Sequence, residues 1–60
     1  MHPQRIQQIT EALFNNSASV IKRGILEYVT LEELLDLSVH PDERTAFRAA
    51  WALEHVLLAD

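Results

Sequence analysis

The sequence predicts an all-α fold of four short helices arranged as two antiparallel helix pairs within one domain, residues 1–60. Three observations lead to this fold class. The chain has one glycine and two prolines while 48% of its residues are hydrophobic, a composition that favours helices. Apolar residues recur at helical spacing, and polar residues that start or stop helices divide them into four segments. A chain of 60 residues has room for a single domain.

The first helix is expected at about residues 3–15. Pro3 suits the first turn, because its missing N–H would have no partner at that position anyway. The apolar residues of this segment share one face: Ile6, Ile9 and Leu13. The polar run 15–17 favours turns and caps, so it ends the helix.

The second helix is expected at about residues 18–28, with the Ser17 hydroxyl as its N-cap. Its apolar set is Ala18, Ile21, Ile25, Tyr28 and Val29. Tyr28 is expected to face the core with its hydroxyl at the rim. Gly24 has two interpretations: tolerance at a surface position, or close approach of a neighbouring helix.

The third helix is expected at about residues 31–39. Thr30 and Glu33 have the spacing of a capping box, in which each side chain accepts a hydrogen bond from the other residue's backbone N–H. The predicted buried stripe is Leu31, Leu34, Leu35 and Val39. Pro41 ends the helix by His40, whose side chain is expected to contact the free carbonyls of the last turn.

The fourth helix is expected at about residues 43–59, with Asp42 as its N-cap. At 100° per residue, one apolar side comprises Ala46, Ala49, Ala50, Leu53, Val56 and Leu57. An adjoining side comprises Phe47, Trp51, Glu54 and Leu58. The strip left for water comprises Thr45, Arg48, Ala52, His55 and Ala59. A helix that is apolar over most of its circumference is buried from more than one side.

The apolar surface of the fourth helix is larger than three short helices are expected to cover. The fourth helix also has no Gly or Asn C-cap, and Asp60 has the unfavourable sign at the negative end of the helix dipole. Three explanations stay open: the native chain continues past Asp60, a second copy packs there, or a self-sufficient bundle has a frayed end.

Composition and charge narrow the possible partners. The formal charge is −4, which provides no positive field for phosphate and argues against nucleic acid and anionic membranes as partners. If the chain were a DNA-binding helix-turn-helix, its fourth helix would be the recognition helix and would have only Arg44, Arg48 and His55 for contact with DNA. The apolar runs are far shorter than the ~20 residues of a membrane span. The absence of cysteine leaves the cytoplasm as the expected location.

No catalytic, cofactor or metal motif is present in the 60 residues. Glu54 and His55 are adjacent and point about 100° apart, whereas metal ligands on a helix need three- or four-residue spacing. The serines lack a nucleophile elbow. The sequence therefore predicts a protein that is not an enzyme and holds no cofactor or metal.

The segments 31–39 and 42–59, with the Pro41-Asp42 turn between them and an alanine-rich second helix around Trp51, resemble a HEAT-like repeat of the α-solenoid class. The resemblance covers about half of the chain and implies that the first two helices form a preceding pair or an N-terminal cap. It also implies a scaffold that binds macromolecules through its second helices. On this chain the implied surface is Arg48, Trp51, Ala52 and His55.

We therefore expect a non-catalytic protein–protein interaction scaffold or adaptor that acts through contact with an unknown protein partner. The candidate interaction surface is Phe47, Arg48, Trp51, His55 and Leu58. One alternative is an accessory or regulatory domain of a small bacterial enzyme whose chemistry lies elsewhere. Another is a self-contained homodimeric helical bundle, in which assembly itself is the function.

Overall fold

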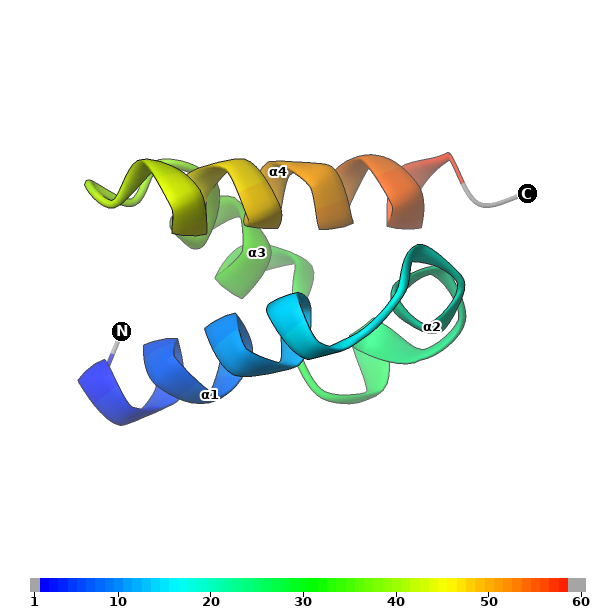
Figure 1. Cartoon of the computed structure of the whole chain (residues 1–60), viewed down its shortest axis with the longest axis horizontal. Helices are drawn as coiled ribbons and strands as arrows, with labels where there is room; N and C mark the ends of the chain where they lie inside the picture. Colours follow the sequence, from blue (N-terminus) through cyan, green and yellow to red (C-terminus); the bar gives the residue numbers. More distant parts are fainter. Residues whose placement is uncertain (1, 59–60) are drawn as a thin grey trace.

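The computed structural model describes residues 2–58 and confirms the all-α class; the described residues contain no strand (Figure 1). Its elements, in chain order, are α1 (Pro3–Asn15), α2 (Ala18–Gly24), a short 3₁₀ turn η1 (Ile25–Glu27), α3 (Leu31–Ser38) and α4 (Glu43–Leu57). The N-caps expected from the sequence are present. Ser17 accepts a hydrogen bond from the Val20 N–H, and Asp42 accepts one from the Arg44 N–H.

Helix α4 is the central element of the fold. It packs against α1, α2 and α3, most extensively against α3. In Figure 1, α4 lies along one side of the molecule and α1 along the other, with α3 between them. Extensive packing is absent between α1 and α2 among the described residues. The predicted arrangement as two antiparallel helix pairs is therefore not confirmed, since α1 packs on α4 and has little contact with α2.

One hydrophobic core joins the four helices. Its buried side chains are Ile9, Leu13, Ile21, Ile25, Val29, Leu34, Leu37, Ala49, Ala52 and Leu53. Every helix contributes to this set, so no helix buries its apolar face without the others. Ile6, Ala12, Trp51 and Val56 are partly buried against the same cluster.

The second helix is shorter than predicted. Helix α2 ends at Gly24, where the backbone leaves helical geometry (φ −141°, ψ −1°), and η1 follows. A β-carbon added at Gly24 would meet no atom within 4 Å, so no neighbouring helix approaches closely there. The poor helix propensity of glycine accounts for the break. Because the chain turns here, Ile25 and Val29 are buried, whereas Tyr28 is exposed and its predicted core position is wrong.

Of the four residues in the predicted buried stripe of α3, Leu34 alone is buried. Leu34 and Leu37, three residues apart, are buried against the other helices, and Leu31, Leu35 and Val39 are exposed. The helix ends at Ser38, and Val39 is its C-cap. Leucines at four positions make several stripes equally apolar, so spacing alone did not identify the buried one.

Helix α4 is also rotated relative to the prediction. Thr45 and Ala52, expected to face water, are buried, and Ala52 is 0% exposed. Ala50 and Leu57, expected in the core, are exposed. Small side chains at positions 45, 49 and 52 allow close packing of the neighbouring helices on this side. Ala59 lies outside the described residues.

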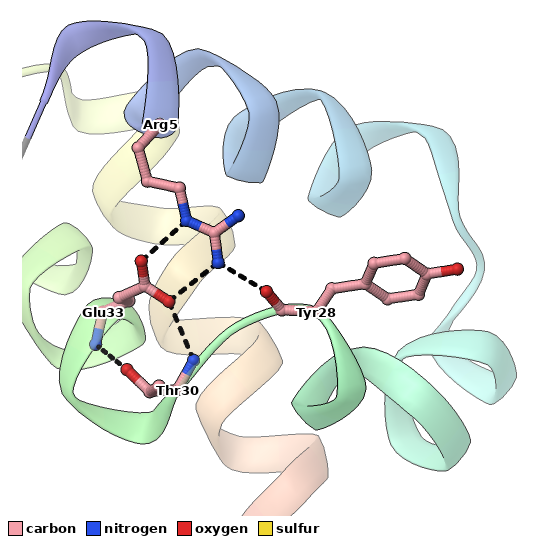
Figure 2. Close-up of polar contacts among 4 residues, drawn as sticks. All are labelled: Arg5, Tyr28, Thr30 and Glu33. Atoms are coloured by element: carbon pink, nitrogen blue, oxygen red, sulfur yellow. Dashed lines mark hydrogen bonds and ion pairs between the residues drawn. The ribbon is translucent and has the colours of Figure 1, made fainter.

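A polar network joins the start of α1 to the start of α3 (Figure 2). Thr30 and Glu33 form the predicted capping box: the Glu33 N–H donates to Thr30 Oγ1 over 3.1 Å, and the Thr30 N–H donates to Glu33 Oε1 over 2.9 Å. The Arg5 guanidinium donates to both Glu33 carboxylate oxygens, at 2.7 and 3.0 Å, and to the carbonyl oxygen of Tyr28. One arginine therefore holds α1, the loop before Thr30 and α3 together.

Because of this network, the stability of the fold is expected to depend on pH. Hydrogen bonds from the Arg5 side chain, and next from the Thr30 backbone, lower the pKa of Glu33 from 4.5 to about 2. A carboxylate with a depressed pKa stabilises the folded state above its unfolded-state pKa. We expect this contribution to be complete above pH 4.5 and to be lost as the pH falls toward 2.

Urea unfolding at several pH values between 2 and 6, about the range that these titrations span, measures the effect. The Glu33→Gln variant is expected to lose less stability than the unmodified chain between pH 4.5 and 2, because it lacks the titrating group. Glu32→Gln, at the neighbouring exposed position, is the matched control. Identical acid sensitivity in Glu33→Gln and the unmodified chain would contradict the role given to Glu33.

Candidate interaction surface

The five residues of the predicted surface all lie on or at the end of α4, but they divide into two groups. Arg48, Trp51 and His55 form a row in which each side chain contacts the next, and all three are partly buried. Phe47 and Leu58 point outward, with 73% and 70% of their surface exposed. The predicted surface therefore consists of a packed row and two exposed apolar side chains beside it.

Arg48 fixes the end of α1 against α4. Its Nε donates to the carbonyl oxygen of Leu13 over 2.8 Å, and its Nη2 donates to that of Asn16 over 3.2 Å. Carbonyls at a helix C-terminus have no hydrogen-bond donor within the helix and lie at the negative end of its dipole. A cationic donor such as arginine therefore both pairs with these oxygens and offsets the negative charge. The Asn16 side chain also donates to the carbonyl of Ala12, over 2.6 Å. The guanidinium is thereby held in one place.

The Arg48 guanidinium also lies close to two aromatic rings. The Arg48 Cζ lies 3.7 Å from the centroid of the Trp51 ring and 5.5 Å from that of Phe14. His55 contacts Trp51 in an edge-to-face arrangement, with ring centroids 4.8 Å apart and planes at 71°. A cation over an aromatic face contributes about 0.5–2 kcal/mol. The Trp51 side chain is therefore held in place by contacts within the chain.

Phe14, Arg44 and Phe47 extend this surface from α4 onto the end of α1. Arg44 lies over the Phe14 ring, with its Cζ 5.6 Å from the centroid. Together with Glu43 these residues line an open groove of about 410 Å³. Neither Phe14 nor Arg44 was among the predicted surface residues, because the contact joins segments 30 residues apart and leaves no local signal in the sequence.

The surface implied by the HEAT-like resemblance is wrong at one of its four positions. Ala52 is fully buried, so Arg48, Trp51, Ala52 and His55 cannot all face a partner. The remaining three are partly buried, and of these Arg48 contacts the end of α1. The part of α4 that is fully open to contact is the side carrying Phe47, Leu57 and Leu58.

Two histidines accept hydrogen bonds from backbone N–H groups two residues later in the chain. The Nδ1 atom of His2 accepts a hydrogen bond from the Gln4 N–H over 3.1 Å, which makes His2 the N-cap of α1. The Nδ1 atom of His40 accepts one from the Asp42 N–H over 3.0 Å. The expected contact of the His40 side chain with the last carbonyls of α3 is therefore wrong, because the ring accepts a bond from the start of the next segment.

A second hollow lies between α1 and α2, with a volume of about 340 Å³. Its lining is Ala12, Asn16, Val20, Ile21, Gly24, Ile25, Glu27 and Tyr28. Glu27 is the one carboxylate in this lining, and no serine or histidine accompanies it. The hollow thus brings together no nucleophile and base. Among residues 2–58, no group of three or more His, Asp or Glu side chains is placed to hold a metal ion.

No protein-family model, characterised protein or solved structure is detectably similar to this chain. In the part of the chain that the structure describes, none of the helices has both the length and the apolar character needed to cross a membrane. The geometry of the α4 surface is therefore the main guide to function.

Proposed function

We propose that this chain is a non-catalytic protein-binding module, built from HEAT-like helix pairs, that acts through the outer surface of α4. The observation that carries this proposal is the exposure of Phe47 and Leu58 directly beside the packed row of Arg48, Trp51 and His55. Aromatic residues and arginine are the side chains most enriched where proteins bind each other. We place the protein in the cytoplasm, because a chain without cysteine is compatible with that compartment.

Three physical features support this proposal. The exposed side of α4 carries large apolar side chains that three helices of the same chain leave uncovered. The adjacent Arg48 and Trp51 are already held by contacts within the chain, so binding costs little side-chain entropy there. The third is the groove between Phe14 and Phe47, which gives a partner side chain a concave place to enter.

Site-specific photo-crosslinking tests the proposal. A photoreactive phenylalanine analogue replaces Phe47 in one variant and Leu58 in another, and the chain is irradiated in the cells that make it. We expect both variants to form covalent complexes with the same protein. The same analogue at Gln8, an exposed position on α1, is the matched control and is expected to give none. Equal labelling at Gln8, or none at Phe47 and Leu58, would overturn the proposal.

A further inference from the structure

The exposed face of α3 has a composition that complements the groove at Phe14 and Phe47. Leu31 and Leu35 are four residues apart and exposed, the latter at 56%. Each is followed directly by an exposed carboxylate, Glu32 and Asp36 respectively. On a helix, this spacing places an apolar stripe beside a row of negative charge. We call these four residues the acidic leucine face.

The groove presents the opposite combination. Phe14 and Phe47 provide its apolar walls, and Arg44 lies exposed at its edge, over the Phe14 ring. Arg48, whose Cζ lies 5.5 Å from the centroid of the Phe14 ring, adds a second positive charge, whereas Glu43 is the single carboxylate that lines the groove. We call Phe14, Arg44 and Phe47 the basic aromatic patch. In a chain with a net charge of −4, this local excess of positive charge stands out.

Both charge sets lack an ion-pair partner among residues 2–58. Among residues 2–58 one ion pair is formed, and it joins Arg5 to Glu33. Neither Arg44 nor the carboxylates of Glu32 and Asp36 takes part in it. An arginine can bind a carboxylate through two parallel hydrogen bonds, which fixes geometry as well as adding attraction.

We propose that the basic aromatic patch of one copy binds the acidic leucine face of α3 in a second copy. The leucine stripe enters the groove between the two phenylalanines, and the carboxylates that follow the leucines reach Arg44 at its edge. An amphipathic helix in an apolar groove is a common mode of protein recognition. This inference rests on the proposed function, because it identifies the partner of the same α4 surface.

The two surfaces belong to one chain, so every copy offers both. Two such contacts between a pair of copies close a symmetric dimer, and successive contacts in one direction build an open chain of copies. Sedimentation velocity of the 60-residue chain at low salt, from micromolar to millimolar concentration, is expected to show concentration-dependent association in either case. A chain that stays monomeric up to millimolar concentration would overturn the inference.

Charge exchange tests which surfaces meet. Arg44→Glu makes the patch acidic, and Glu32→Lys with Asp36→Lys makes the face of α3 basic. Each variant alone then opposes like charges, and we expect its association to weaken about tenfold or more. In an equal mixture of the two, each patch again meets a face of opposite charge. We expect the mixture to associate as the unmodified chain does, and a mixture that stays monomeric would contradict the pairing.

Two further variants separate this effect from a loss of folding or a change in net charge. Arg23→Glu makes the same charge change at an exposed position on α2 and is expected to leave association unchanged. Phe47→Ala removes an apolar wall without altering charge and is expected to weaken association. Circular dichroism verifies that every variant keeps its helix content. Equal weakening by Arg23→Glu and Arg44→Glu would show that net charge, and not the patch, controls association.

The photo-crosslinking experiment keeps this inference distinct from the proposed function. Covalent complexes of two identical chains formed through position 47 agree with both. A different protein captured at position 47, with a chain that is monomeric at millimolar concentration, overturns the second-copy inference and leaves the proposed function standing.

Discussion

Replacing Leu34 with alanine is expected to unfold most of the protein at 25 °C. Leu34 is 0% exposed and belongs to the core that all four helices share. Leucine-to-alanine changes at such sites cost about 2–5 kcal/mol, through lost burial and the cavity that remains. A core of this size rarely supplies more than about 3–5 kcal/mol in total. A single truncation therefore removes most of the available stability.

The neighbouring leucine provides the control for this prediction. Leu35→Ala is the same chemical change one residue later, at an exposed position. We expect it to alter the free energy of unfolding by about 0.5 kcal/mol or less when the chain is dilute. Urea titration followed by circular dichroism and by Trp51 fluorescence measures both variants. Similar midpoints for the two would show that α3 does not bury the face seen in the structure.

The second large effect is expected at Arg48. Arg48→Met keeps most of the aliphatic length of the side chain but removes both hydrogen bonds to the carbonyls of Leu13 and Asn16. It also removes the cation over the Trp51 ring. Hydrogen bonds that involve a charged group contribute about 1.5–3 kcal/mol, so we expect a loss of about 2–3 kcal/mol. The Trp51 emission spectrum should shift as well, because the ring loses its fixed neighbour.

Arg44→Met separates this effect from a general loss of positive charge. Arg44 lies one turn earlier on α4 and is exposed, and its described interaction is with the Phe14 ring at 5.6 Å. We expect a change of about 0.5 kcal/mol or less in the free energy of unfolding. Arg48→Lys should recover part of the loss, since lysine keeps the charge but cannot make the forked pair of bonds. Equal destabilisation by the Arg44 and Arg48 variants would contradict the structural role of Arg48.

The parts of this fold that could be predicted are those decided by neighbouring residues. Thr30 and Glu33 form their capping box because the chemistry is complete within four positions. The bounds of α1 agree with the range 3–15 because Pro3 and the polar run at its end act locally. These signals need no knowledge of what packs against the helix.

The rotation of each helix about its axis could not be predicted in the same way. Thr45 and Ala52 are buried because three neighbouring helices pack closely on the side of α4 where side chains are small. Apolar content alone correctly predicted that Ala49 and Leu53 are buried, but it also placed the exposed Ala50 and Leu57 in the core. The same reason explains the missed contacts of the candidate surface: Arg48 binds carbonyls 32 and 35 residues earlier in the chain. Spacing within one helix contains no information about such pairs.

The place of α4 in the fold also determines how the protein can fluctuate. Because α1, α2 and α3 each pack on α4 while α1 and α2 have little contact with each other, release of α4 exposes the core on every side at once. After release of α4, the polar contacts of Arg5 with Glu33 and Tyr28 still join α1 to α3, but the shared apolar core has lost its central helix. The most protected amide hydrogens of α4 should therefore exchange with solvent only when the whole chain unfolds, with the free energy of global unfolding.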